Sequence, residues 1–221
     1  MSYGLRLALI DADEMVREGR VLLLQSQPEM QIVFQTGDAG LALESIGEYL
    51  LDVVIVDTRV PGWRAEKYIA ELGSRLDEAD NEAQILALAS FASAEFELAC
   101  LKAGVSAFVT SDLGVATLLR QLKVLGAGER SISRKYLEGL LAEVVGQPAP
   151  HPGLALSLES MDANQSAVLK AMLEGLSDAQ IAREQQLTKY RVTKFLESLR
   201  ESSGFRTRNQ LAIELLGLGV N

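Results

Sequence analysis

The first half of the chain alternates short, continuously apolar runs with longer segments in which apolar residues recur every three or four positions. Apolar runs of this length are typical of parallel strands that are covered on both faces. Five β-α units in succession predict a doubly wound α/β domain with a five-stranded parallel sheet. Ligands gather at the carboxyl ends of such strands, where Asp11 and Asp57 both lie. The predicted strands are residues 5–11, 31–37, 52–57, 84–90 and 107–110, and the predicted helices lie near 14–26, 39–50, 65–78, 94–103 and 113–126.

The last part of the chain, residues 158–221, has an all-helical pattern whose boundaries are marked by capping residues. Gly175 and Gly204 lie where the first and third helices are expected to end. Two short helices, near 177–185 and 189–202, are separated only by QQLT, which predicts a helix-turn-helix. Caps are expected at Thr188 and at three pairs with the spacing of a capping box, namely Asp162 with Gln165, Ser177 with Gln180, and Thr207 with Gln210.

A segment rich in proline and glycine separates the two patterns. GQPAPHPG, at 146–153, contains three of the five prolines in the chain and has no helical or strand period, so it is interpreted as a linker. A helical stretch at 134–145 precedes it. We therefore expect a first domain at 1–127, a helical connector and linker at 128–157, and a helix-turn-helix domain at 158–221.

The net charge of −9 at pH 7 belongs entirely to the first part of the chain. Residues 1–157 contain 22 acidic and 13 basic residues, whereas the remainder contains eight of each. Residues 189–208 include six basic residues and only two acidic ones. A local basic stripe on an otherwise acidic protein favours binding to an acidic partner such as DNA.

Several classes of function are excluded by what the sequence lacks. The single cysteine, Cys100, rules out an internal disulfide and fits a reducing cytoplasm. The single histidine, His151, lies in the linker, so neither a Ser-His-Asp triad nor a histidine-based metal site is expected. No nucleophile–base pair or phosphate-binding glycine loop is evident, and we expect neither an enzyme nor a cofactor. We expect no signal peptide, and no apolar run approaches the roughly 20 residues that cross a bilayer.

The sequence resembles two-component response regulators of the NarL/FixJ type, in which a receiver domain precedes a LuxR-type helix-turn-helix. The resemblance covers nearly the whole chain. In the second part it rests on residues 168–211, VLKAMLEGLSDAQIAREQQLTKYRVTKFLESLRESSGFRTRNQL. In the first part it rests on VREG at 16–19, DVVIVDTRVPG at 52–62 and AGVSAF at 103–108. The family's receiver has the five-stranded α/β fold that the pattern predicts.

The resemblance implies a phosphorylation site at the carboxyl ends of the strands, but several positions depart from the family pattern. Asp57 matches the aspartate that accepts the phosphoryl group, and Asp11 matches the first acid of a pair that holds a magnesium ion. Ala12 takes the position of the second acid. Ala89 lies where receivers have serine or threonine, with Ser90 one place later, and Ser111 lies at the position of the receiver's lysine.

These departures predict a pseudo-receiver, a receiver-like domain that works independently of Asp57 phosphorylation. An alanine methyl offers no ligand to Mg²⁺, and phosphorylation of a carboxylate needs both the metal and a fixed cation. Asp13 is not expected to replace the missing acid, because residues two apart do not share a helix face. The same acids also have a structural interpretation, in which Asp11 caps the first helix together with Glu14.

The basic helix is expected to bind double-stranded DNA. In a helix-turn-helix, the first turns of the second helix enter the major groove, where arginine or lysine can bind guanine. A helix N-terminus with nearby arginines can hold a phosphate. The candidate DNA-binding residues are Lys189, Tyr190, Arg191, Thr193 and Lys194 on the second helix, and Arg206 and Arg208 at the start of the last helix.

A homodimer is expected, because DNA half-sites are read by two-fold dimers and the last helix carries much apolar surface. The leading interpretation is a cytoplasmic, sequence-specific transcription regulator whose pseudo-receiver serves for dimerisation or binds a protein or a small molecule. One alternative is a phosphorylation-dependent regulator in which Asp13 and Ser90 complete the site around Asp57. Another is a protein-interaction antagonist with a vestigial helix-turn-helix.

Overall fold

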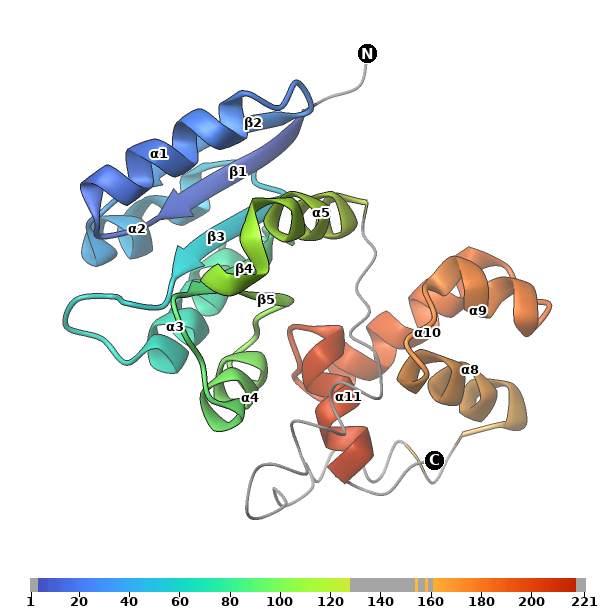
Figure 1. Ribbon diagram of the computed structural model, residues 1–221. Coiled ribbons are helices and arrows are strands. Elements are labelled where there is room, and N and C mark those ends of the chain that lie inside the picture. The colour runs from blue at the N-terminus through green and yellow to red at the C-terminus, as the bar shows by residue number, and fades with distance from the viewer. Residues whose placement is uncertain (1–3, 128–153, 155–157, 159–160, 218–221) are drawn as a thin grey trace. The chain divides into compact units, whose positions relative to one another are not determined.

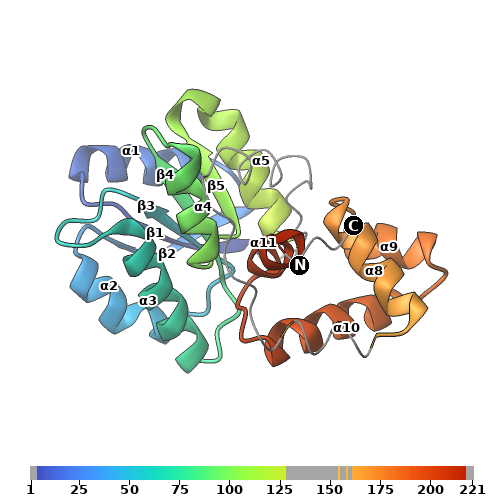
Figure 2. The same ribbon diagram turned by 90° about the horizontal axis from the view of Figure 1, so that it is seen from below.

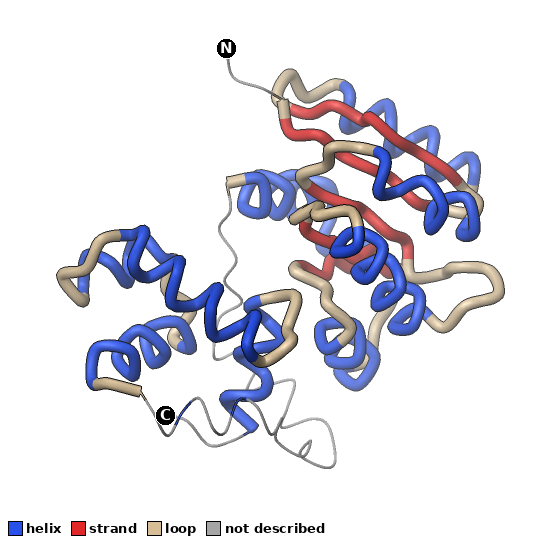
Figure 3. The backbone as a smooth tube through the Cα atoms, turned by 180° about the vertical axis from the view of Figure 1, so that it is seen from behind, coloured by secondary structure: helices blue, strands red, loops and turns tan. Residues whose placement is uncertain are grey.

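The computed structural model describes residues 4–127, 154, 158 and 161–217 (Figures 1 and 3). This part of the chain divides into two compact units, one containing all the strands and the other the last four helices. The predicted connector and linker at 128–157 lie outside the described residues, apart from Leu154.

The first unit is the predicted doubly wound α/β fold, with five parallel strands in the order β2-β1-β3-β4-β5. The strands are β1 (Leu5–Ile10), β2 (Met30–Thr36), β3 (Val53–Asp57), β4 (Gln84–Ala89) and β5 (Ala107–Thr110). Every residue of β3 and β4 is buried, which explains why these strands have continuously apolar sequences. The fold class inferred from the sequence is thus confirmed.

Helices cover both faces of the sheet (Figure 2). Successive strand residues point to opposite faces, and one of the two resulting sets packs against α1 and α5. Helix α3, whose buried residues include Tyr68 and Leu72, lies on the opposite face with α2. The helices are α1 (Glu14–Gln25), α2 (Ala39–Ser45), α3 (Ala65–Glu78), α4 (Ala94–Lys102) and α5 (Gly114–Gly126).

Two local predictions in this unit need correction. The helix expected over 39–50 is α-helical only to Ser45 and continues as a short 3-10 turn, η1 (Ile46–Glu48). The cap of α1 is Asp13 and not Asp11, because the Asp13 carboxylate accepts the Val16 amide at 3.1 Å. Asp11 instead accepts the amide of Asp13 at 3.0 Å, in the turn that leads into the helix.

The second unit contains α8 (Ala163–Leu173), α9 (Asp178–Glu184), α10 (Lys189–Ser202) and α11 (Arg208–Gly217), and residues 93–98, which include the first part of α4, are grouped with it. The expected caps are present: Asp162 and Gln165 bind each other's backbone amides at 2.8–2.9 Å, and the Thr188 side chain accepts the Arg191 amide at 3.3 Å. Gly175 and Gly204 follow α8 and α10 with φ of 86° and 69°, as the sequence predicts. The helix-turn-helix prediction is therefore correct in type and nearly correct in boundaries.

No helix in the described ranges is both long enough and apolar enough to span a membrane.

Two leucines of α1 allow a matched test of the packing of the first unit. Leu24 is 1% exposed and belongs to the core, whereas Leu22 is 70% exposed. Leu24→Ala should lower the free energy of unfolding by about 2–5 kcal/mol, because it removes buried methyl groups and leaves a cavity. Leu22→Ala should change it by no more than about 0.5 kcal/mol. Urea denaturation followed by fluorescence of Trp63, the only tryptophan, reports on this unit, and equal effects of the two variants would contradict the assignment.

Candidate functional site

The carboxyl ends of four neighbouring strands bring the predicted receiver residues to one edge of the sheet. Ile10 is paired with Val56, so Asp11 and Asp57 follow side by side at the ends of β1 and β3. Asp11 is only 2% exposed to solvent and Asp57 only 3%. We call the group of Asp11, Asp57 and the side chains that bind them the carboxyl-edge pocket.

The Asp57 carboxylate receives four hydrogen bonds, all from arginine residues. The Arg59 backbone amide and Nε donate to Oδ1 at 3.0 and 2.9 Å, and Arg59 Nη2 donates to Oδ2 at 3.0 Å. Arg20 Nη1 also donates to Oδ2, at 3.0 Å. Since a carboxylate offers about four lone-pair sites, these donors use its whole capacity to accept hydrogen bonds.

Arg20, from the second turn of α1, connects the two buried acids. Its Nη1 atom contacts Oδ2 of Asp57 and also Oδ2 of Asp11. The Arg20 side chain is 19% exposed, whereas that of Arg59 is 55% exposed, so Arg20 is the inner of the two cations. Arg17, one turn earlier, donates to the Asp11 backbone carbonyl at 2.8 Å and fixes the chain at the end of β1.

The surroundings act differently on the two acids. Burial opposes ionisation of Asp57, but the hydrogen bonds from Arg59 and Arg20 outweigh it and hold the pKa of this carboxyl below its usual value. Burial also acts on Asp11 and raises the pKa of that carboxyl, although the Asp13 amide and the Arg20 charge oppose this effect. Asp57 is therefore the more firmly ionised member of the pair.

Of the other predicted receiver positions, Asp13 contacts these acids through its backbone amide, which donates to Asp11 Oδ1, and its side chain is engaged elsewhere. Ala12 and Asp13 are exposed, with Asp13 engaged as the cap of α1. Ala89 is buried at the end of β4, and Ser90 is exposed. The Ser111 hydroxyl donates to the Ala89 carbonyl at 3.3 Å, which joins two of the departures from the receiver pattern across adjacent strand ends.

The residues of the carboxyl-edge pocket do not fit a magnesium ion. Magnesium needs oxygen ligands in near-octahedral geometry, usually one or two carboxylates with several waters. Here a guanidinium nitrogen contacts an oxygen of each buried acid, and the second acid position is an alanine. Among the residues that the structure describes, no three acidic, histidine or cysteine side chains are arranged to hold a metal.

The two arginines that bind Asp57 were not identified from the sequence. Arg59 lies two residues beyond a strand-end aspartate, a spacing at which a side chain can reach back to the same turn. Arg20 lies on α1 three residues after Arg17, so the two share a helix face. A pair of arginines on this face was the available signal, but only the register of β1 and β3 shows what they contact.

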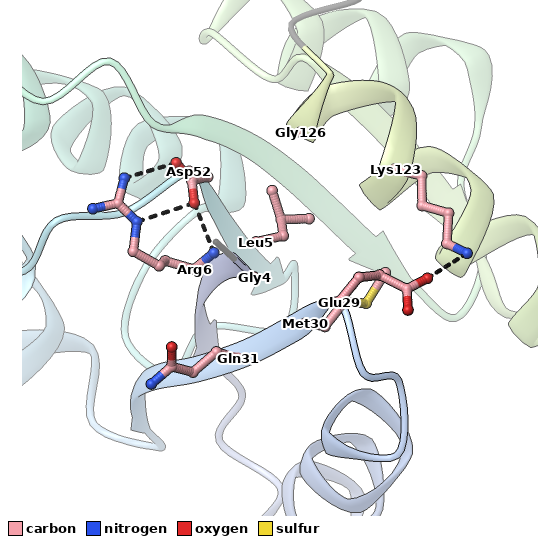
Figure 4. A pocket seen from close by; sticks show the side chains of 9 residues that line it. All are labelled: Gly4, Leu5, Arg6, Glu29, Met30, Gln31, Asp52, Lys123 and Gly126. Atoms are coloured by element: carbon pink, nitrogen blue, oxygen red, sulfur yellow. Dashed lines mark hydrogen bonds and ion pairs between the residues drawn. The ribbon is translucent and has the colours of Figure 1, made fainter. Parts of the chain in front are cut away.

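A cavity of about 620 Å³ lies at the opposite edge of the sheet (Figure 4). Its charged groups bind one another: Arg6 donates to Asp52 from Nε at 3.1 Å and from Nη2 at 2.8 Å, and Lys123 contacts Glu29 at 2.5 Å. This cavity is far from the strand ends that carry Asp57, and its charges are already compensated. The residues that line it are Gly4, Leu5, Arg6, Glu29, Met30, Gln31, Asp52, Lys123 and Gly126.

The first two turns of α10 present the candidate DNA-binding residues to solvent. Lys189, Tyr190, Arg191 and Lys194 are exposed, and Tyr190 has 71% of its surface accessible. Lys194 Nζ contacts the Glu197 carboxylate at 3.0 Å, and this hydrogen bond raises the pKa of Lys194. The opposite side of the helix is buried and carries Val192, Leu196 and Leu199.

Thr193 and Arg208 have internal partners. The Thr193 hydroxyl donates to Asp178 Oδ2 at 2.7 Å, and Arg208 Nη1 contacts Asp178 Oδ1 at 2.6 Å. Arg208 Nη2 also donates to the Leu176 carbonyl at 2.7 Å, and the Arg208 side chain is only 11% exposed. One carboxylate at the start of α9 therefore ties α10 and α11 together. These contacts provide a structural role for two residues that the sequence assigned to DNA.

Arg206 is half-buried, and its backbone carbonyl accepts a hydrogen bond from Arg200. This contact fixes the segment between α10 and α11, directly before the cap of α11. At that cap the Thr207 amide donates to Gln210 Oε1 at 2.8 Å.

Comparisons with known proteins agree with this architecture, although no protein-family model matches the chain. It is 28% identical over 205 residues to the DNA-binding transcriptional activator DevR/DosR of Mycobacterium tuberculosis, covering 93% of this chain and 91% of that protein. A two-component response regulator of the LuxR family from Aurantimonas sp. SI85-9A1 is 28% identical, with a TM-score of 0.55 over 65% of this chain and 99% of that chain. The RcsB response regulator of Salmonella typhimurium has the same fold over 98% of both chains, at 16% identity and a TM-score of 0.55.

The ion pairs of Asp57 predict how the stability of the first unit depends on pH. Asp57→Asn should lower the free energy of unfolding by about 1–3 kcal/mol at pH 7, because it removes charged hydrogen bonds from a buried group. The pKa of Asp57 is lowered in the folded state, so its contribution is complete above the unfolded value of about 3.9 and is lost as the pH falls through the folded value. The difference between wild type and variant should thus shrink in strong acid.

Urea denaturation of both proteins at pH 7 and at successively lower pH measures this effect. Asp13→Asn is the control, since Asp13 is exposed and asparagine is an equally good helix cap. A difference between wild type and Asp57→Asn that stayed constant down to strong acid would contradict the role given to Arg20 and Arg59.

Proposed function

We propose that this chain, whose homologues are DNA-binding response regulators of the NarL/LuxR family, is a sequence-specific transcription regulator whose receiver-like domain works without phosphorylation of Asp57. The observation that carries the proposal is the arginine binding of Asp57, which engages both carboxylate oxygens of the phosphoacceptor position. The DNA-binding half rests on the exposed basic residues at the start of α10.

The start of α10 suits the major groove. A recognition helix contacts base edges with its first residues, and arginine or lysine can bind the O6 and N7 atoms of guanine. Lys189 and Arg191 lie in the first turn of α10, which has no acidic residue. Tyr190 and Lys194 extend the same exposed surface. We assign base recognition to these four residues.

Thr193 and Arg208 act in this proposal as positioning residues. Asp178 accepts a hydrogen bond from each, and the resulting bridge fixes α10 and α11 relative to α9. Arg206 remains assigned to the DNA backbone, because it lies just before the N-terminus of α11, where the helix dipole favours a phosphate.

The receiver-like domain lacks the second acid and the lysine that the receiver pattern places around the phosphoacceptor. Transfer requires a metal ion and a cation that offset the developing charge on the transferring oxygens. Ala12 and Ser111 provide neither. Asp57 itself would have to give up hydrogen bonds to two guanidinium groups before one of its oxygens could attack phosphorus. With phosphorylation set aside, we propose that the receiver-like domain responds to a protein or small-molecule ligand, or serves for dimerisation.

A homodimer is part of the proposal, because DNA sites for this class of motif are commonly two-fold and are read by two copies of the protein. The apolar residues of α11 are less available for this purpose than the sequence indicates. Leu211, Ile213 and Leu215 are all buried, so they offer little surface to a second copy. Leu218 lies outside the described residues.

Arg191 provides the test of DNA binding. DNA fragments selected from a random pool by the full chain should bind with an affinity that falls as salt rises, because bound phosphates release counterions. Arg191→Ala should weaken binding to the selected sequence by about 1–3 kcal/mol and relax the preference at one base position. Arg183→Ala is the control, because Arg183 is an exposed arginine on α9 and not on α10. The proposal would be contradicted if the full chain selected no DNA from the pool, or if the two variants lost equal amounts of binding affinity.

Phosphodonors provide the test of the receiver-like domain. Acetyl phosphate, or beryllium fluoride with magnesium, should leave both the affinity for the selected DNA and the oligomeric state of the protein unchanged. The reason is that Asp57 is engaged by Arg20 and Arg59 and the pocket lacks a metal ligand at position 12. A reproducible change in affinity or oligomeric state, abolished by Asp57→Asn, would show that this half of the proposal is wrong.

A further inference from the structure

We propose that Arg20 is a built-in cation that takes the place of a divalent metal ion between Asp11 and Asp57, and that its removal turns the carboxyl-edge pocket into a metal site. This inference deepens the proposed function, since it names the group that keeps the receiver-like domain in one state. It rests on the position of a single guanidinium nitrogen between the two buried acids.

The first argument is the geometry of the shared contact. Arg20 Nη1 is bound both to Asp11 Oδ2 and to Asp57 Oδ2, so one oxygen of each carboxylate is directed at the same point. Two oxygens that converge on a point, with the remaining positions open to water, are what Mg²⁺ or Mn²⁺ commonly uses in proteins. The guanidinium occupies that point.

The second argument is the balance of charge. Two carboxylates that are 2–3% exposed and lie side by side repel each other and lose hydration, so a buried pair needs a compensating cation. In the described part of the chain, Arg20 is the only basic side chain with a hydrogen bond to both acids. Arg59 contacts only Asp57, and its side chain is 55% exposed.

The third argument is the chemical character of arginine. A guanidinium stays protonated at any physiological pH, and it cannot dissociate from the chain as a metal ion can. Its charge is therefore present regardless of the concentrations of magnesium and phosphodonor. In a receiver whose cation is a side chain, the charge between the two acids is always present. In a receiver that binds Mg²⁺, that charge depends on the concentration of magnesium.

Manganese titration of the full chain tests this inference, with free Mn²⁺ measured by electron paramagnetic resonance. Wild type should show no saturable site in the millimolar range, whereas Arg20→Ala should bind one Mn²⁺ per chain. The double variant Arg20→Ala with Asp11→Asn should lose that site. Arg17→Ala is the matched control, because Arg17 lies on the same helix but contacts the Asp11 backbone carbonyl and neither carboxylate, and it should behave as wild type.

Thermal unfolding gives a second readout. Arg20→Ala should melt below wild type in a chelating buffer and should regain part of the lost melting temperature when Mn²⁺ is added, because a ligand that binds only the folded state stabilises it. Wild type and Arg17→Ala should show no such metal-dependent gain. Should Arg20→Ala fail to fold, Arg20→Met keeps the aliphatic stem of the side chain, and the same expectations apply to it.

The outcomes separate this inference from the proposed function. Saturable Mn²⁺ binding by wild type that Asp11→Asn removes, or no new site in either Arg20 variant, would overturn the role of Arg20. Both titrations are made without DNA and without a phosphodonor, so either result leaves the tests of DNA binding and of phosphorylation to be decided by their own measurements.

Discussion

The contact of one arginine nitrogen with two buried carboxylates is the interaction on which the rest of the first unit depends. The parallel register of β1 and β3 places Asp11 and Asp57 next to each other at the edge where a doubly wound sheet binds its ligands. Neither acid can be buried there as an anion without a nearby cation, and α1 supplies it from its second turn. The end of β1, the start of α1 and the end of β3 are thereby joined through Arg20.

The departures from the receiver pattern all lie at the same edge of the sheet as the two buried acids. At three positions where the resemblance implies groups that serve a metal ion and a phosphoryl group, the chain has Ala12, Ala89 and Ser111, and arginines bind Asp11 and Asp57. The Ser111 hydroxyl is directed at the Ala89 carbonyl and not into the pocket. The alanine at position 12 and the internal cation are chemically compatible, since two buried carboxylates need a cation beside them and Arg20 is one.

The second unit uses the same device for another purpose. Asp178, at the start of α9, receives the Thr193 hydroxyl and the Arg208 guanidinium, and so connects three of its four helices. A helix-turn-helix recognises bases only if its second helix is held at a fixed angle, and short helices have little apolar contact with which to fix it. The bridge leaves Lys189, Tyr190, Arg191 and Lys194, in the first two turns of α10, exposed to solvent.

The sequence by itself determined the kind and order of the elements, because apolar runs, helical periods and capping pairs are local signals. It also placed Asp11 and Asp57 at strand ends and the basic residues on α10. What surrounds an acid once the strands align is not a local property. Only the tertiary structure decided that Asp13 caps α1, that Arg20 lies between Asp11 and Asp57, and that Arg208 is bound inside the domain. Each of these depends on which side chains are brought together from distant segments, and a long arginine side chain can reach several positions that its place in the sequence does not distinguish.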